Sequence, residues 1–249
     1  MRTRGLLRAL SEELFGAGVP LYSFPRVKSL RGLGMSDSDS YAKVLREKFD
    51  YKNTEFHRAP KFDIGEPGAG ESGSYDFLIV SEVFEHVVPP VEAAFRNAWR
   101  LLKPNGVMIF TAPYSLKATT AEHFPDLHSH TVAQLGDQMV LVNRTREGQI
   151  QVFENLVFHG GLGTTLEMRE FSEASLRNLF TAAGFQSLRI FGEDYAPFGI
   201  VRNENCSLPL AARKGEFSFT RENAAEMIAN WQRLLQRKWI RLGDKLGVV

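Results

Sequence analysis

The chain has 249 residues, of which 43% are hydrophobic and 24% charged, and this length fits one α/β domain with extensions and a full core. Its formal net charge of +1 gives no basic surface for a phosphate backbone, so we expect no nucleic-acid partner. The single cysteine, Cys206, excludes an intrachain disulfide, and no stretch reaches the roughly 18 apolar residues of a membrane span, so we expect a soluble, cytoplasmic protein with no membrane partner.

The first 26 residues read as a helical or irregular segment before the main domain. The sequence LLRALSEELF has a helical pattern, and Gly16 directly after it favours a helix stop. Pro20 and Pro25 restrict the remainder, so we expect no regular strand with a tight glycine turn there.

Strands and helices alternate from about residue 27 to residue 113, which predicts a mostly parallel sheet with helices on both faces. Residues 27–35 read as a strand ending in glycines, and a helix follows from about Ser40 to about Tyr51. Residues 54–57 read as a brief strand, and a glycine-rich loop covers residues 65–74.

The strongest strand signal is YDFLIVS, residues 75–81, whose continuous apolar run is typical of a strand buried on both faces. Pro89 and Pro90 open a helix, which we expect residues 103–106 (KPNG) to end. VMIFTAP follows as the next buried strand, and we expect it to pair in parallel with YDFLIVS.

The alternation is interrupted by an insertion at about residues 115–170. QMVLVNRTREGQIQVF predicts a β-hairpin around Glu147 and Gly148. A loop rich in histidine and aspartate precedes it, with His123, Asp126, His128 and His130.

The alternation resumes after the insertion. Ser172 is a plausible N-cap and Gly184 a helix stop, with two further strands in SLRIFGE and SLPLAARK. The main domain therefore covers residues 27–215, and residues 216–249 form a C-terminal helix. This helix has a long apolar stripe, which favours burial against the domain or a partner chain. The stripe consists of Ala224, Met227, Ile228, Trp231, Leu234 and Leu235.

Three blocks in order carry a resemblance to a known family: RGLGMSDSDSYAKVLREKF, NTEFHRAPKFDI and YDFLIVSEVFEHVVPPVEAAFRNAWRLLKPNGVMIFTAPYS. Together they resemble class I (Rossmann-like) S-adenosylmethionine-dependent methyltransferases, in particular the group that includes ubiquinone-biosynthesis O-methyltransferases. The resemblance implies S-adenosyl-L-methionine as cofactor and methylation of an oxygen on a small molecule or sugar. It also implies cofactor contacts at the strand ends, which we expect at Gly32, Gly34, Asp37, Asp63, Ser81, Glu82, Glu85 and His86.

The sequence also departs from that family, because its glycine-rich GxGxG loop has no good match. We take residues 27–35 as the second strand of the fold. At its end the family commonly has an acid that binds the ribose hydroxyls, and Gly34 occupies that position here. Asp37 either substitutes for this acid or caps the following helix. A pocket wall built irregularly from residues 15–25 and weak cofactor binding would follow. The competing hypothesis is a non-catalytic domain that binds a ligand or partner. A nicotinamide-dependent oxidoreductase is disfavoured, because GxGxxG with an acid about 20 residues later is missing.

The loop after VMIFTAP supplies the candidate catalytic groups. His123 or His128 would act as general base with Asp126 as orienter, because a carboxylate-oriented imidazole can take a hydroxyl proton. Ordinary loop packing and a metal site are the alternatives, and since the spacing matches no specific ligand pattern we expect no metal. His159 either lines the substrate mouth or belongs to a tight turn.

Overall fold

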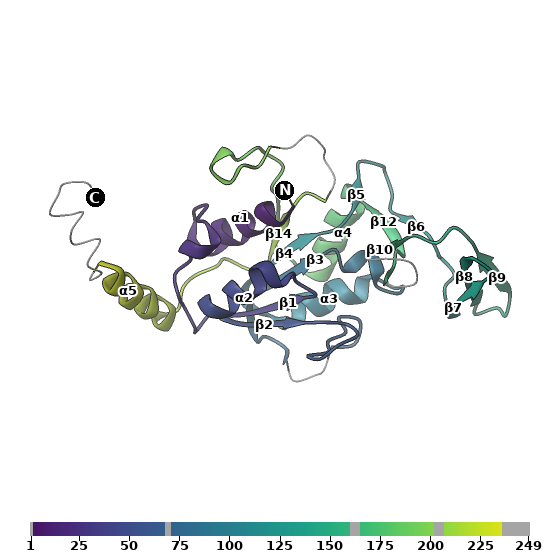
Figure 1. Cartoon of the computed structure of the whole chain (residues 1–249), viewed down its shortest axis with the longest axis horizontal. Helices are drawn as coiled ribbons and strands as arrows, with labels where there is room; N and C mark the ends of the chain where they lie inside the picture. Colours follow the sequence, from purple (N-terminus) through teal and green to yellow (C-terminus); the bar gives the residue numbers. More distant parts are fainter. Residues whose placement is uncertain (1, 68–70, 160–164, 202–206, 236–249) are drawn as a thin grey trace.

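The structure, a computed structural model, describes residues 2–67, 71–159, 165–201 and 207–235. Its centre is a sheet with the order β13-β14-β4-β3-β1-β2 (Figure 1). The strands are β1 (Arg31–Met35), β2 (Asp50–Thr54), β3 (Tyr75–Ser81), β4 (Leu102–Thr111), β13 (Ser187–Ile190) and β14 (Leu210–Arg213). This α/β architecture is the predicted Rossmann-like methyltransferase fold.

The sheet is parallel over one half and antiparallel over the other. β2, β1, β3 and β4 are parallel neighbours, and Ile79 of β3 lies opposite Ile109 of β4, so the predicted pairing of the two apolar runs is confirmed. β14 is antiparallel to both β4 and β13. Among the described residues the sheet has six strands.

The strand order corrects the position that we assigned to residues 27–35. Within residues 2–26 the structure has no strand, as predicted, yet β1 lies between β2 and β3 and is the first strand of the sheet, not the second. The chain runs outward from β1 to β2 and then crosses to β3 on the other side of β1. The switch point of the sheet therefore lies between β1 and β3, where open α/β sheets bind their ligands.

Helices cover both faces of the sheet, each over its own core. One core joins α1 (Arg2–Phe15) and α2 (Asp39–Lys48) to side chains such as Phe77 and Ile109. The other joins α3 (Glu92–Leu101) and α4 (Glu173–Ala183) to alternate residues of the same strands, such as Leu78 and Phe110. This two-sided burial explains why β3 and β4 are apolar without alternation.

Three element boundaries differ from the sequence prediction. Helix α2 ends at Lys48, and Tyr51 lies inside β2, which occupies residues before the predicted 54–57. The KPNG segment belongs to β4, whose strand begins at Leu102. Gly16 ends α1 as predicted, with a left-handed φ of 72° and its N–H donating to the Glu12 carbonyl.

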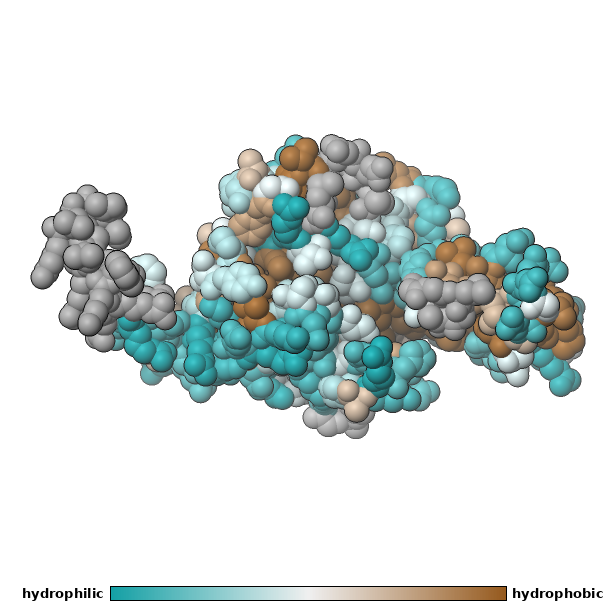
Figure 2. Space-filling model, in the orientation of Figure 1, coloured by the Kyte–Doolittle hydropathy of each residue, from teal (hydrophilic) through white to brown (hydrophobic). Residues whose placement is uncertain are grey.

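The insertion forms a separate lobe and a short second sheet. β8 (Gln138–Arg144) and β9 (Ile150–Phe153) form the predicted hairpin, but β7 (Ser129–Leu135), which pairs with β8, was expected as loop. Hydrophobic residues gather on this lobe in Figure 2, among them the exposed Leu135 and Ile150. The other strands, most of them short, are β5 (Tyr114–Ser115), β6 (Ala121–Glu122), β10 (Phe158–His159), β11 (Thr165–Leu166) and β12 (Arg169–Ser172).

The predicted C-terminal helix is α5 (Arg221–Leu235), which extends away from the sheet (Figure 1). Met227 packs on the first core, whereas Ile228 and Trp231 are 59% and 64% exposed. The side chains of Leu234 and Leu235 and the whole of Cys206 lie outside the described residues. None of the described helices is long and apolar enough to cross a membrane.

Candidate functional site

A cavity of about 1370 Å³ opens at the carboxyl ends of β1, β2 and β3. Its lining includes Met35 at the end of β1 and Ser36 after it, Glu55 after β2, and Glu82 and Val83 after β3. The volume is large enough for a nucleoside-sized cofactor with an acceptor beside it. The cavity therefore occupies the switch point that the strand order defines.

Two non-glycine residues at this edge have left-handed backbones. Ser36 directly follows β1 with φ of 59°, and Glu82 directly follows β3 with φ of 56°. Such a conformation costs of the order of 1 kcal/mol or more for a residue with a side chain, and it persists where the surroundings impose it. Both residues line the cavity, so the strain is concentrated at the candidate site.

Two predicted acids follow β3, and Glu82 is the one whose carboxylate is partly exposed and lines the cavity. Its Oε2 pairs with Arg2 Nη1 of α1 at 3.0 Å. Its Oε1 is buried and accepts no hydrogen bond from the described residues. A buried oxygen of this kind needs a donor, and a ligand hydroxyl or ammonium in the cavity can supply one.

Two more acids border the cavity from the β2 side. The carboxylate of Asp63, a predicted contact, accepts the backbone N–H of Gly65 at 2.8 Å. Glu55 follows β2, and its carboxylate forms an exposed ion pair with Arg58 at 3.3 Å. In nucleoside-binding sheets, an acid about 20 residues beyond the glycines of the first strand contacts the ribose. We did not predict Glu55 as that acid, because we took residues 27–35 as the second strand.

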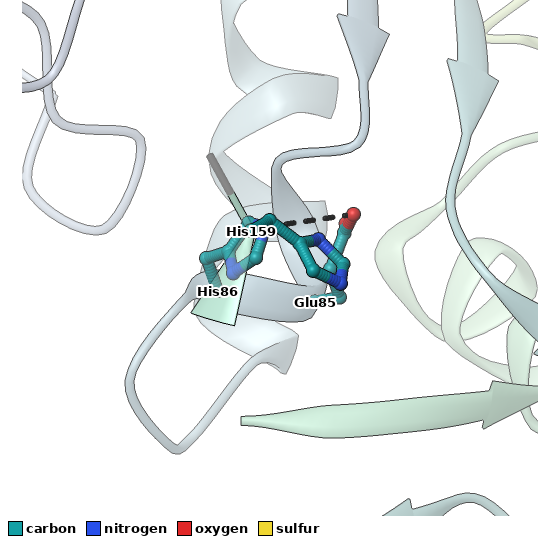
Figure 3. Close-up of side chains that lie close together, drawn as sticks. All are labelled: Glu85, His86 and His159. Carbon is teal, nitrogen blue, oxygen red and sulfur yellow. Dashed lines mark ion pairs between the residues drawn. The ribbon is translucent and has the colours of Figure 1, made fainter. Parts of the chain in front are cut away.

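A polar cluster, defined here as Glu85, His86, His123, His159 and Glu167, borders the cavity through His86 and His159 (Figure 3 shows three of its members). Glu85 and His86 belong to the 3₁₀ turn η3 (Phe84–His86), which follows β3.

Residues 166–169 of the insertion hold this turn in place. Leu166 accepts a hydrogen bond from His86 Nδ1 at 2.8 Å, and Met168 donates its N–H to the Glu85 carbonyl at 2.8 Å. The fully buried Arg169 donates to the carbonyls at both ends of the turn, those of Phe84 and Val87. The insertion therefore positions side chains that the resemblance placed at the cofactor site.

Glu85 is the most buried acid of the cluster, with no exposed surface. Burial raises the pKa of its carboxyl well above the ordinary value, and the nearby charge of Glu82 adds to this. Burial likewise lowers the pKa of His86. Perturbed groups of this kind concentrate at functional sites.

Glu167 joins two histidines through its two oxygens. His123 Nε2 donates to Oε1 at 2.9 Å, and His159 Nε2 lies 2.9 Å from Oε2. His86 and His159 line the cavity, whereas His123 reaches its wall only through Glu167. The role of Glu167 was missed, because only the pairing of β10 with β11 brings it beside His159.

Five predicted cofactor contacts do not line the cavity: the fully buried Glu85 described above, and Gly32, Gly34, Asp37 and Ser81. Gly32 and Gly34 lie within β1, where a Cβ would collide with the Phe77 ring and with the Tyr51 hydroxyl, respectively. Asp37 is buried and accepts hydrogen bonds from Tyr41 and Tyr51, while Ser38 caps α2. The Ser81 hydroxyl bonds to that of Thr111 at 2.9 Å. Gly32, Gly34, Asp37 and Ser81 shape the strands behind the cavity, because their side chains or Cα atoms face neighbouring strands.

The structure also does not bring Asp126 and His128 to the cavity. The Asp126 carboxylate accepts from Gln151 at 3.2 Å, and the His128 N–H donates to Asn143 at 2.9 Å, both within the hairpin lobe. The chain turns away from the strand end between Phe124 and β7 and packs on the small core of this lobe. Of the three predicted catalytic residues, only His123 belongs to the polar cluster.

A second hollow of about 870 Å³ lies between the segment after α1 and helix α5. Tyr22, Lys48 and Trp231 are among its lining residues. No strand of the sheet ends there, so the chemistry concentrates at the cavity of β1 to β3.

The methyltransferase domain family matches residues 29–190 of the chain. Among solved structures, the 1,6-didemethyltoxoflavin-N1-methyltransferase of Burkholderia thailandensis is 14% identical over 85% of this chain and 79% of its own, with a TM-score of 0.42. The sugar N-methyltransferase KedS8 of a Streptoalloteichus species is 13% identical, with coverages of 84% and 86% and a TM-score of 0.44. No curated protein matches the chain. At these identities, the solved structures share a general fold and no more.

Proposed function

Because the chain belongs to the methyltransferase domain family, we propose that it transfers a methyl group from S-adenosylmethionine to a small-molecule acceptor. The observation that carries the proposal is the cavity at the ends of β1, β2 and β3, with the left-handed Ser36 and Glu82 and its acids. The cofactor supplies a methyl group on a sulfonium, which is open to in-line displacement by a nucleophile.

The cavity residues fit such a cofactor. Glu55 would accept the ribose hydroxyls, since it follows the second strand at the expected distance from the glycines. Glu82, with its unsatisfied buried oxygen, would take a hydroxyl or the ammonium of the amino-acid part. Asp63 and His86, which line the cavity, and Glu85 in the turn beside it remain proposed contacts.

We propose an oxygen acceptor, as in the ubiquinone-biosynthesis group, because the polar cluster offers imidazoles oriented by a carboxylate. A hydroxyl becomes a better nucleophile when such a group takes its proton. His123 is the proposed base that takes this proton, and the Glu167 carboxylate orients its ring. Holding the hydroxyl close and in line would supply much of the rate enhancement.

Calorimetric titration of the full chain with S-adenosylhomocysteine tests cofactor binding. The sequence-based expectation of weak binding assumed that the first strand was missing, whereas β1 is that strand, so we now expect a micromolar dissociation constant. Glu55→Gln and Glu82→Gln should each weaken binding roughly 10- to 100-fold, the effect of losing a hydrogen bond to a charged group. Glu154→Gln, an exposed acid of the hairpin lobe, is the matched control and should bind normally. The absence of binding at millimolar ligand would contradict the proposal.

Methyl transfer itself requires an assay with a panel of hydroxyl acceptors. Tight binding without turnover on any hydroxyl, amine or thiol acceptor would favour the non-catalytic alternative. Transfer to amines alone would remove the proposed oxygen acceptor but leave the methyltransferase.

A further inference from the structure

We propose that Glu85, His86 and His159 bind a divalent transition-metal cation of the zinc class at the wall of the cavity. One potential ligand atom of each residue lies within 4.8 Å of those of the other two. Two imidazoles and one carboxylate form a set that zinc uses in catalytic sites, with the fourth position open to water or substrate. The proposal departs from our sequence-based expectation of no metal site, and it does not depend on methyl transfer.

Glu85 supplies the strongest evidence for a bound cation. Its side chain has no exposed surface, and neither carboxylate oxygen accepts a hydrogen bond from the described residues. An unpaired buried carboxylate costs several kcal/mol, so the group either keeps a proton, which agrees with its raised pKa, or gives the proton up to a bound cation. His86 Nε2 lies 3.7 Å from Oε1, which is too far for a hydrogen bond (Figure 3).

His86 has the orientation of a metal ligand. Because the Leu166 carbonyl can only accept, Nδ1 of His86 carries the proton that it donates at 2.8 Å. The other ring nitrogen, Nε2, therefore presents its lone pair towards Glu85. Metal-bound histidines almost always donate their second N–H to a carbonyl or carboxylate in this way.

His159 has a comparable partner in Glu167, whose Oε2 lies 2.9 Å from Nε2. The same carboxylate is held by His123 through its other oxygen, so its orientation is set from two sides. The His159 ring packs edge-on to that of His86 with centroids 4.8 Å apart. A carboxylate–histidine pair of this kind raises ligand basicity and holds the ring in place.

The spacing needs only a small closure to complete the site. Ligands at 2.0–2.2 Å around a tetrahedral metal lie roughly 3.4 Å apart, against the observed limit of 4.8 Å. Imidazole donors favour zinc, cobalt, nickel or copper over magnesium and calcium, which prefer oxygen ligands. Because His86 and His159 line the cavity, the open position would face the space where an acceptor oxygen lies.

Metal analysis and calorimetry of the full chain with Zn²⁺ test the proposal. After dialysis against a chelator, we expect one Zn²⁺ to rebind per chain, and Co²⁺ to give the visible absorption of a tetrahedral site. Glu85→Gln, His86→Ala and His159→Ala should each weaken Zn²⁺ binding at least 100-fold, and Glu167→Gln roughly 10- to 100-fold through the second shell of the site. His130→Ala, an exposed histidine of β7, is the control and should bind like the unchanged chain.

Circular dichroism of each variant separates lost binding from lost folding. If Glu85→Gln does not fold, the half-exposed His159 still provides the decisive variant. The proposal is overturned if the unchanged chain binds no stoichiometric Zn²⁺, or if His159→Ala and His86→Ala bind it as tightly as the control. Loss of S-adenosylhomocysteine binding with retained Zn²⁺ binding would remove the proposed function and leave the metal site.

Discussion

At the scale of single residues, Asp37 links pH to stability. Burial raises the pKa of its carboxyl from 3.8 to about 7, although hydrogen bonds from Tyr41 and Tyr51 oppose the shift. The folded chain therefore keeps a proton that the unfolded chain releases between about pH 4 and pH 7. The associated stabilisation is complete below about pH 4 and is lost as the pH rises through 7, by on the order of 4 kcal/mol at most.

The variant Asp37→Asn isolates this effect, because it resembles the protonated carboxyl at every pH. The difference in free energy of unfolding between the unchanged chain and the variant should fall as the pH rises from 4 to 8, when measured by urea denaturation. A difference that stays constant over this range would show that Asp37 titrates at its ordinary pKa.

Gly34 illustrates a glycine needed for packing. A Cβ at this position would collide with the Tyr51 hydroxyl and the Asp37 carboxylate. We expect Gly34→Ala to lower the free energy of unfolding by roughly 1–3 kcal/mol, the usual cost of overpacking. Gly192→Ala is the matched control, since its Cβ would meet only Leu208 Cδ1 at 3.5 Å. Equal stabilities for the two variants would contradict this packing role.

The sequence allowed the site residues after β3 to be predicted, but not those after β1 and β2. Glu82 and His86 follow the most apolar strand, so their place at a sheet edge could be inferred. Glu55 depended on strand order, which is set by the long-range pairing of β1 with both β2 and β3. His159 depended on the insertion folding back over the turn at Glu85, which no local pattern indicates.

At the scale of elements, α4 is the helix that local signals define best. The Ser172 side chain accepts the N–H of Ser175 at 3.0 Å, and Gly184 ends the helix with φ of 103°. Ser172→Ala should therefore lower the free energy of unfolding by about 1 kcal/mol. Ser187→Ala, at the exposed start of β13, should change it little. The comparison requires denaturant titrations of both variants, and equal stabilities would mean that water replaces the cap.

Local sequence patterns did not predict β2 and β7, and the physical reason differs between the two strands. β2 has the sequence DYKNT, in which polar residues outnumber apolar ones, and its strand character comes from the ladder with β1. β7 is almost entirely exposed, so burial leaves no periodic pattern in its sequence. By contrast, β3 and β4 are buried on both faces, and their apolar runs predicted both strands.

At the scale of the whole molecule, the two ends of the domain are tied together. Arg213 of β14 donates to the Glu13 carbonyl of α1 and pairs with the Glu13 carboxylate, each at 2.6 Å. Arg213→Met should lower the free energy of unfolding by roughly 1–3 kcal/mol, because both partners are largely buried. Lys43→Met, which removes an exposed pair with Asp39, should cost under 1 kcal/mol. Similar losses in both variants would show that the Arg213 contacts are energetically equivalent to a surface pair.

Helix α5 leaves one surface of the whole molecule without a described partner. Its exposed Ile228 and Trp231 are apolar, while Met227 anchors the helix to the first core. Contact with another chain through this helix remains a prediction. Sedimentation of the unchanged chain and of Trp231→Glu would test it, because only the former should associate.

The tie between α1 and β14 also bears on the order in which the protein can mature on the ribosome. Glu13 and Arg213 are 200 residues apart, so α1 meets its strand partner only after these 200 residues have been synthesised. At 5–20 residues per second this delay is about 10–40 s. During that interval Leu6, Leu10 and Leu14 present an apolar stripe that only part of the sheet can cover. The nascent chain therefore offers a binding site for chaperones that disappears once β14 enters the sheet.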